Sequence, residues 1–116
     1  MRDHTKLRAF ELADEIAVLT YQITRTFPKE ETYGLTCQMR RAAVSVPSNI
    51  VEGCTRKSQI EYVYFLEIAY GSLMELHYQF DLAKRLGYLK DQDILYCDNI
   101  MLEAKKVLNG LICSLR

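Results

Sequence analysis

The sequence contains few of the residues that interrupt helices. Its 116 residues include two prolines, five glycines and no tryptophan, and basic and acidic residues balance to a formal net charge of zero. No window approaches the roughly 18 consecutive apolar residues of a membrane span. With 49% apolar and 26% charged residues, the chain is not typical of a disordered tail. The length predicts one domain over residues 1–116, without a domain-wide field for nucleic acid or anionic lipid.

The residues that usually build metal and catalytic sites are scarce and scattered. The four cysteines show no two-residue spacing, and the two histidines, His4 and His77, lie far apart in the sequence. We therefore expect no metal and no cofactor. Neither a glycine-rich phosphate loop nor a nucleophile with a spaced histidine occurs, so the sequence predicts a protein that is not an enzyme. We expect His4 at a frayed terminus and His77 at a helix surface or interface.

The start of the chain carries no recognisable export signal, because a charged amphipathic segment follows Met1 directly. We therefore expect a cytoplasmic protein with four reduced thiols.

Three clusters of helix-breaking residues divide the chain into four segments. They lie at residues 27–34, 53–58 and 87–91. Apolar residues recur at intervals of three and four between them, which predicts helices over about 6–26, 33–52, 58–86 and from 91 onward. Because the connections are short, sequential helices should run antiparallel. The predicted fold is all-α, an up-down-up-down four-helix bundle.

Individual residues indicate how these helices begin and end. Ser58 with Glu61 forms a capping box, Gly53 and Gly87 are expected to stop helices, and Asp91 is expected to cap the fourth. Pro47 lies inside the second helix, where it removes a backbone donor and clashes one turn back. We expect a kink there, or a helix that ends and restarts.

The third helix is apolar on more than one side. Tyr64, Ile68, Tyr78 and Leu82 lie off the stripe that would face the core. A second apolar face usually covers a partner, and another copy of the same chain is the simplest partner. The alternative is a wide stripe in a monomeric bundle. The tyrosines of this helix are better explained by packing than by base stacking.

Together, these residues resemble the four helix bundle protein family, whose members are found encoded within intervening sequences of bacterial 23S rRNA genes. The resemblance spans nearly the whole chain and rests on residues 27–35, Gln38, Arg41, Ala42, Ser45, Pro47, Asn49, Ile50, Glu52, Gly53, Phe65, Leu66, Ala69, Gly71, Ser72, Glu75 and residues 87–89. It implies a homopentamer without an established activity. A related branch, the accessory variability determinant of diversity-generating retroelements, binds a reverse transcriptase and nucleic acid. That branch is markedly basic, whereas this chain is neutral.

The matched polar residues of the second helix step by three and four and therefore share one face. We predict a structural polar network of Gln38, Arg41, Ser45, Asn49 and Glu52, with Glu67 and Glu75 of the third helix as candidate partners of Arg41. Ala69, Gly71 and Ser72 are small enough for a neighbouring backbone to approach closely. The alternative function of this stripe is a pocket for a small ligand or a peptide.

Basic residues gather at the end of the bundle that holds both termini and the second loop. The candidate nucleic-acid contacts are Lys6, Arg8, Arg56, Lys57, Lys105 and Lys106. In a ring of subunits these charges would add along one rim and attract RNA or DNA. The alternative is a solvated, salt-screened end without a partner. Two functions therefore remain open: a homo-oligomeric scaffold that engages another protein, or a binder of RNA or DNA.

Overall fold

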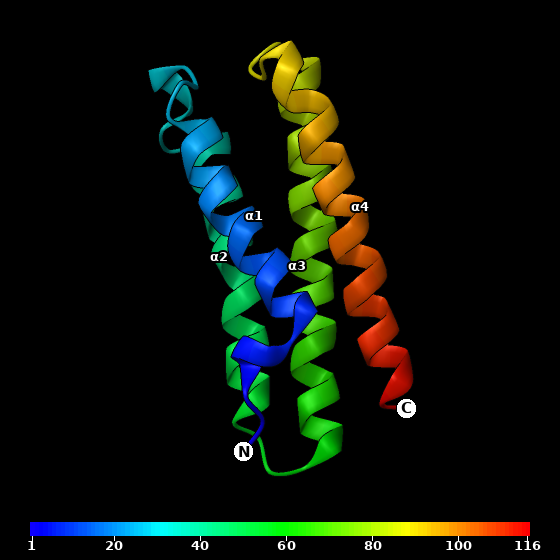
Figure 1. Cartoon of the computed structure of the whole chain (residues 1–116). Helices are drawn as coiled ribbons and strands as arrows, with labels where there is room; N and C mark the ends of the chain where they lie inside the picture. Colours follow the sequence, from blue (N-terminus) through cyan, green and yellow to red (C-terminus); the bar gives the residue numbers. More distant parts are fainter.

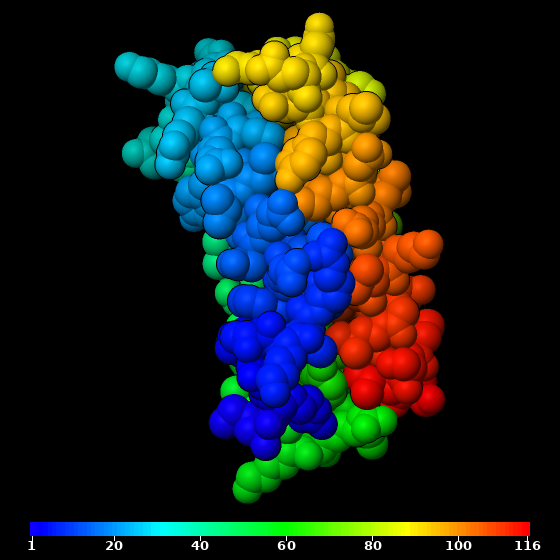
Figure 2. Space-filling model, in the orientation of Figure 1, coloured from blue at the N-terminus to red at the C-terminus, as the bar shows by residue number.

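Four long helices build the whole molecule in the computed structural model, which describes residues 1–116. They are α1 (Arg8–Thr24), α2 (Leu35–Cys54), α3 (Gln59–Arg85) and α4 (Asp91–Ser114), with short 3-10 helices η1 (His4–Lys6) and η2 (Lys29–Glu31). Consecutive helices run in opposite directions (Figure 1), and α4 returns to pack beside α1 (Figure 2). The predicted up-down-up-down bundle is confirmed. None of these helices is both long enough and apolar enough to cross a membrane.

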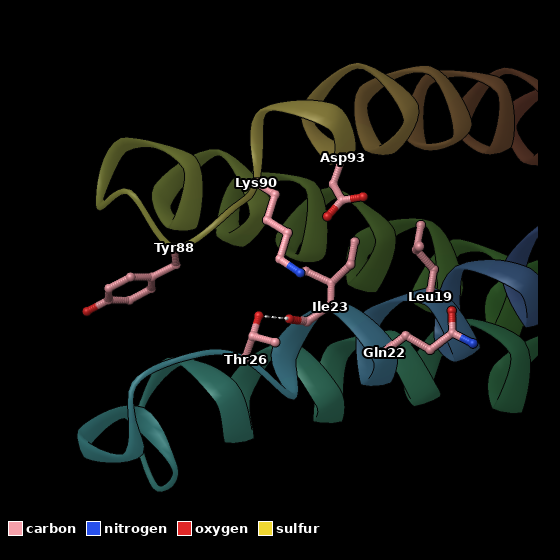
Figure 3. A pocket seen from close by; sticks show the side chains of 7 residues that line it. All are labelled: Leu19, Gln22, Ile23, Thr26, Tyr88, Lys90 and Asp93. Atoms are coloured by element: carbon pink, nitrogen blue, oxygen red, sulfur yellow. Dashed lines mark hydrogen bonds between the residues drawn. The ribbon is translucent and has the colours of Figure 1, made fainter.

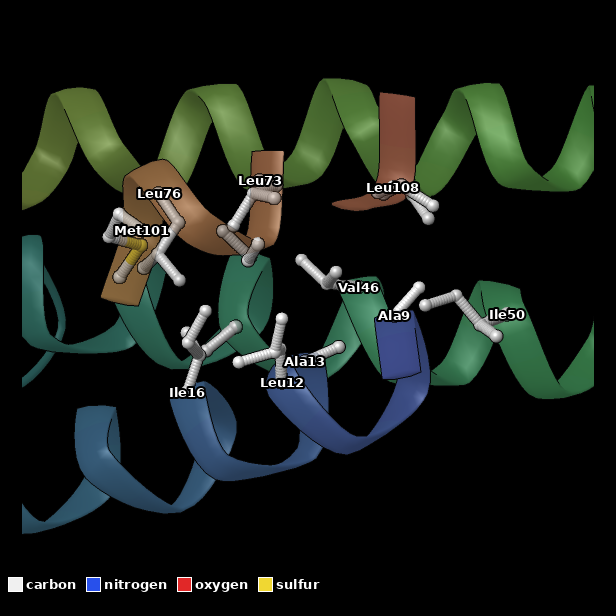
Figure 4. Close-up of a cluster of buried hydrophobic side chains, with 14 of the residues drawn as sticks. Ala9, Leu12, Ala13, Ile16, Val46, Ile50, Leu73, Leu76, Met101 and Leu108 are labelled. Atoms are coloured by element: carbon white, nitrogen blue, oxygen red, sulfur yellow. The ribbon is translucent and has the colours of Figure 1, made fainter. Parts of the chain in front are cut away.

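One hydrophobic core runs along the bundle axis and receives side chains from all four helices (Figure 4). Leu12 and Ile16 of α1, Val46 of α2, Leu73 of α3 and Met101 of α4 are almost fully buried in it. Each helix contributes one stripe at intervals of three and four, which is the spacing that places side chains on one face. The apolar periodicity of the sequence therefore indicates which face of each helix is buried in the core.

The predicted start and end of α3 are stabilised by the expected contacts. Ser58 precedes α3, and its Oγ accepts the backbone N–H of Glu61 at 3.1 Å. Gly87 follows α3 with a φ of +78°, which glycine adopts without strain. The N–H of Gly87 donates to the Lys84 carbonyl, and that of Tyr88 donates to the Ala83 carbonyl. These two hydrogen bonds form a Schellman motif that ends the helix.

The prediction for Asp91 was wrong. Lys90 occupies the N-cap position of α4 and forms no capping hydrogen bond through its side chain. Asp91 lies instead in the first turn of the helix, together with Asp93. Negative side chains are favourable there because they face the positive end of the helix dipole. The aspartate therefore stabilises the same helix terminus from one position further along.

The second helix differs from its prediction at Pro47 and Gly53. It runs unbroken through Pro47, so the expected restart does not occur, and the kink stays a prediction. The side-chain amide of Asn49 donates to the Ser45 carbonyl at 2.8 Å, within the turn that the proline perturbs. Gly53 does not stop the helix, which continues to Cys54.

Gly53 instead allows α2 and α3 to approach each other closely. A Cβ placed on it would lie 3.0 Å from the Cβ of Phe65 and 3.3 Å from a ring carbon of Tyr62. The backbone of α3 has no room to accept that atom without moving. A glycine inside a helix lowers stability by about 1 kcal/mol relative to alanine. At this position, close packing of two helices compensates for that loss.

We predict that Gly53→Ala destabilises the bundle by about 1–3 kcal/mol, the usual cost of overpacking. Gly110→Ala in α4 is the matched control, because a Cβ there meets no atom within 4 Å. It should raise stability by about 1 kcal/mol. Urea unfolding followed by circular dichroism measures both changes, and equal shifts of the two variants would contradict the packing role of Gly53.

Candidate functional site

The predicted polar face of α2 meets α3 through two separate clusters. In the first, Arg41 donates to the Glu75 carboxylate at 2.5 Å and to the side-chain oxygen of Gln38 at 3.2 Å. Gln79 also donates to Glu75, at 3.2 Å. The structure therefore places Glu75 opposite Arg41. The side chains of this ion pair are about half exposed.

In the second cluster, the hydroxyls of Ser45 and Ser72 lie 2.8 Å apart across the α2–α3 contact. Asn49 donates to the Ser45 hydroxyl at 3.0 Å as well as to its carbonyl. These small polar side chains connect the two helices, and each hydrogen bond between them restricts their relative position. The cluster is consistent with a role in register, which stays a prediction.

The other two acidic residues of the predicted network lie apart from these clusters. Glu52 pairs with Arg56 at 3.0 Å on its own end of the bundle. Glu67 pairs with Arg116 at the C-terminus and does not contact Arg41. The choice of Glu67 as a partner of Arg41 was therefore wrong, because the helix register brings the next acidic residue, Glu75, into reach.

The predicted basic end is less exposed than its sequence indicates. Arg8 pairs with both Glu11 and Glu103. The guanidinium of Arg56 pairs with Glu52 and lies over the ring of Phe65, 4.7 Å from its centroid. Arg56, a candidate nucleic-acid contact, therefore does not project freely into solvent, because an aromatic ring and a carboxylate hold it against the bundle.

The candidate lysines separate into two groups. Lys6, Lys57 and Lys106 are exposed and form no salt bridge. Lys105 is half-buried in a groove between α3 and α4, against His77. Lys106, its neighbour in the sequence, is exposed, whereas Lys105 is partly covered. Three of the six predicted contacts are available to a phosphate without breaking an existing interaction.

The first residues of the chain are also packed, so that His4 does not lie at a frayed end. His4 begins η1, and its ring contacts Phe10 edge-on, with 4.7 Å between centroids. Arg2 lies over the ring of Tyr62 and donates to the Arg56 carbonyl at 2.7 Å. The N-terminal segment therefore covers the loop between α2 and α3.

A stripe of exposed side chains follows the outer side of α3. We call it the α3 outer stripe, and it consists of Ile60, Tyr64, Gly71, Met74 and Tyr78. Of the four residues predicted to form a second apolar face, Tyr64 and Tyr78 are 60% and 59% exposed, whereas Ile68 and Leu82 are half-buried, so the monomer leaves only part of that face uncovered. The predicted close approach at Gly71 does not occur within the chain, because a Cβ there would meet nothing within 4 Å.

A small hollow lies at the opposite end of the bundle, between the end of α1 and the start of α4 (Figure 3). Its volume is about 200 Å³, and Leu19, Ile23, Tyr88, Lys90 and Asp93 are among the residues that line it. Ligand pockets usually occupy about 300–1,000 Å³. The backbone N–H of Leu35 donates to Glu31 at 3.0 Å and the hydroxyl of Tyr88 at 2.9 Å, and both lower the pKa of that carboxyl. The hydrogen bond to Glu31 raises the pKa of Tyr88. This hydrogen bond joins two loops and indicates a structural function.

Sequence reasoning missed a line of three polar side chains in the groove between α3 and α4. Lys105 Nζ lies 2.5 Å from His77 Nδ1, and His77 Nε2 lies 3.3 Å from Asp98 Oδ1. Burial lowers the pKa of Lys105, and the charge of Asp98 opposes this effect in part. Nothing in the spacing of these residues signals the cluster, because it depends on the register between two helices.

The cysteines show no sign of activation. Burial, with a smaller contribution from Asp93 and Asp98, raises the pKa of Cys97 to about 12. Burial likewise raises the pKa of Cys54. A thiol that stays protonated is a poor nucleophile. The two buried thiols therefore serve as small core side chains.

These features define an antiparallel four-helix bundle with one exposed apolar stripe and small polar clusters between its helices. The chain belongs to the 23S rRNA-intervening sequence protein family, whose pattern matches residues 5–110. The family resemblance seen in the sequence is thereby confirmed.

A crystal structure with the same fold comes from Bacteroides thetaiotaomicron VPI-5482, a protein of unknown function from the S23 ribosomal protein family. It is 22% identical in sequence, with a TM-score of 0.82 over 90% of this chain and 97% of that chain. No curated protein matches the sequence.

The exposure of Arg41 and Glu75 leads to a prediction about stability. A half-exposed ion pair contributes about 1 kcal/mol or less, so Arg41→Ala should have a small effect that decreases further in high salt. Urea unfolding of Arg41→Ala, Glu75→Gln and the double variant measures the coupling between the two residues. A loss above about 3 kcal/mol that salt does not change would show instead that assembly buries the pair.

Proposed function

We propose that this chain is a non-enzymatic interaction module that assembles into a homo-oligomer, a pentamer by family resemblance, and presents a scaffold surface to another protein. The observation that carries this proposal is the α3 outer stripe. Its five residues recur at three, four and seven, and all lie opposite the face that α3 buries in the core. Exposed apolar side chains arranged in a continuous stripe are typical of an interface.

A closed ring also requires a second, different patch, because each subunit contacts its two neighbours through unlike surfaces. Val18 and Tyr21 of α1 and Val44 of α2 supply one, at 54%, 42% and 42% exposed. Beside them, α2 and the preceding loop form an open groove of about 560 Å³ that includes Tyr33 and Cys37. We name Val18, Tyr21, Tyr33, Cys37 and Val44 the α1–α2 patch. The α3 outer stripe of one copy is proposed to pack on this patch of the next.

The proposal explains the neutral charge of the chain as well. Repeated copies of a highly charged subunit would repel one another, whereas these copies carry no net charge. Interfaces are enriched in tyrosine and methionine, and the α3 outer stripe contains both. The exposed Glu67 lies on the same side of α3, where Arg116 of its own chain pairs with it. The function of the assembly is then to hold several identical surfaces in a fixed arrangement for a protein partner.

We predict that light scattering gives a mass several times the 13.5 kDa of the monomer, five times for the pentamer. The variant Ile60→Glu/Tyr64→Glu should dissociate, because it places two buried charges in the proposed interface. Val18→Glu/Val44→Glu tests the second patch in the same way. Leu95→Glu/Leu102→Glu on α4 is the matched control, because both leucines are exposed outside the two proposed patches.

A wild-type mass of one subunit at micromolar concentration would refute the assembly. Dissociation by the α4 control as strongly as by the stripe variant would show that the interface lies elsewhere. Circular dichroism of each variant separates loss of assembly from loss of the fold.

Binding of RNA or DNA is the second proposal, supported by the exposed Lys6, Lys57 and Lys106 at one end of the bundle. We predict weak retention of generic RNA or DNA that falls steeply with salt, because phosphate contacts release counterions. Lys57→Glu/Lys106→Glu should abolish it without changing the oligomer, whereas Lys29→Glu/Lys84→Glu, at the other end, should not. Absence of retention at low salt would remove nucleic acid from consideration.

A further inference from the structure

The groove between α3 and α4 brings together a lysine, a histidine and an aspartate that the proposed assembly does not use. Its volume is about 370 Å³, and it is lined by Met74, His77, Tyr78, Asp81, Asp98 and Lys105. The amine of Lys105 and the carboxylate of Asp98 contact opposite nitrogens of the His77 ring. The imidazole thus lies in the middle of a chain of hydrogen bonds.

The geometry fixes the direction of these hydrogen bonds. The ammonium of Lys105 has only donors, so Nδ1 of a neutral His77 must accept from it. The proton of the ring then resides on Nε2 and is donated to Asp98. If the lysine proton moves to Nδ1, the resulting imidazolium lies 3.3 Å from a carboxylate that stabilises it. Asp98 forms no such ion pair with Lys105 itself.

We propose that Lys105 is a nucleophilic amine that captures small neutral aldehydes as a Schiff base, with His77 as the proton acceptor and donor and Asp98 as the group that positions the imidazole. A neutral aldehyde suits the groove better than an anionic acyl donor, because the carboxylate of Asp98 repels negative charge, whereas that of Asp81 is paired with Arg85. The apolar side of the groove, with Met74 and the ring of Tyr78, accommodates a short alkyl chain.

The reaction is balanced by the residues present. His77 takes a proton from the Lys105 ammonium, and the free amine attacks the carbonyl carbon to form a C–N bond. A proton moves from nitrogen to oxygen in the carbinolamine. The imidazolium returns its proton to the carbinolamine hydroxyl, which leaves as water, and the nitrogen lone pair forms the iminium. The charge of Asp98 stabilises this cation, and His77 ends in its neutral form.

The local environment favours the free amine at Lys105 over other lysines. Burial lowers the pKa of Lys105, and the charge of Asp98 from α4 opposes this effect. The titratable residues of α3 that line the groove are His77, which contacts the amine, Tyr78, and Asp81, which pairs with Arg85. Lys106 is the natural control, because it is next in the sequence and exposed. A positioned acid–base group typically accelerates proton transfer about 100-fold or more.

The test uses the full chain with propanal and sodium cyanoborohydride, which reduces the iminium to a stable secondary amine. Peptide mass spectrometry over time gives the rates at Lys105 and Lys106. At pH 7 we expect Lys105 to react at least about tenfold faster, since the groove is open to solvent and the full ~100-fold is not reached. The rate at Lys105 should also level off below the ordinary pKa of a lysine amine, because burial lowers the pKa of Lys105.

Two variants distinguish proton transfer through His77 from an effect of the burial of Lys105 alone. His77→Gln keeps a hydrogen-bond acceptor but cannot take a proton, and should bring Lys105 down to the rate of Lys106. Asp98→Asn removes the charge that opposes the lowering of the Lys105 pKa, yet it should slow Lys105, because the imidazolium loses the carboxylate that contacts it. If Asp98 acted only by holding the ammonium, the same variant would accelerate the reaction, and that result would overturn the relay.

The labelling is repeated in Ile60→Glu/Tyr64→Glu, because Met74 and Tyr78 belong to both the groove and the α3 outer stripe. Fast labelling of Lys105 in either form supports the site, whatever the oligomeric state. Equal rates at Lys105 and Lys106 in both forms overturn it. Lys105→Arg must abolish the excess label, and circular dichroism checks that each variant is folded.

Discussion

The close contact between α2 and α3 determines the rest of this bundle. Of all pairs of helices, these two make the most extensive contact. Gly53 meets the side chains of Phe65 and Tyr62 at one end, and the Ser45 and Ser72 hydroxyls lie 2.8 Å apart further along. The two helices can approach each other this closely only where small residues line their contact. Once α2 and α3 are joined, the short loops bring α1 and α4 onto the remaining sides, and the fold closes.

The sequence predicted the parts of the fold that depend on local chemistry. Ser58 and Gly87 were assigned correctly because a cap and a positive φ are properties of a few neighbouring residues. The prediction for Gly53 was wrong because its role depends on a contact between helices. The sequence alone does not distinguish a glycine that ends a helix from one that lets a second helix pack closely. Asp91 differed from its prediction by a single position, which is the ordinary uncertainty of a helix start.

Contacts between helices were less accessible to sequence reasoning. The polar face of α2 was identified from its period, yet the choice between Glu67 and Glu75 requires the register of α3 against α2. The sequence assigns Lys105 to the basic end because that end of the bundle holds the C-terminus. On a helix, adjacent residues point about 100° apart, so one lysine faces solvent and the other faces α3. His77 and Asp98 come close to Lys105 only when α3 and α4 pack against each other.

The exposed glycine of α3 connects the fold to the proposed assembly. Gly71 lies in the middle of a 27-residue helix, where it lowers helix stability by about 1 kcal/mol relative to alanine, and it packs against nothing in its own chain. Gly53 shows what a glycine achieves in this fold when a second helix lies against it. On the same side of α3, Glu67 lies one turn before Gly71 and Met74 one turn after it, and a Cβ on Gly71 would meet no atom within 4 Å. A helix of a second copy that packs there would approach the backbone as closely as α3 approaches α2, and the loss in helix stability at Gly71 would then be offset across the interface rather than within the monomer.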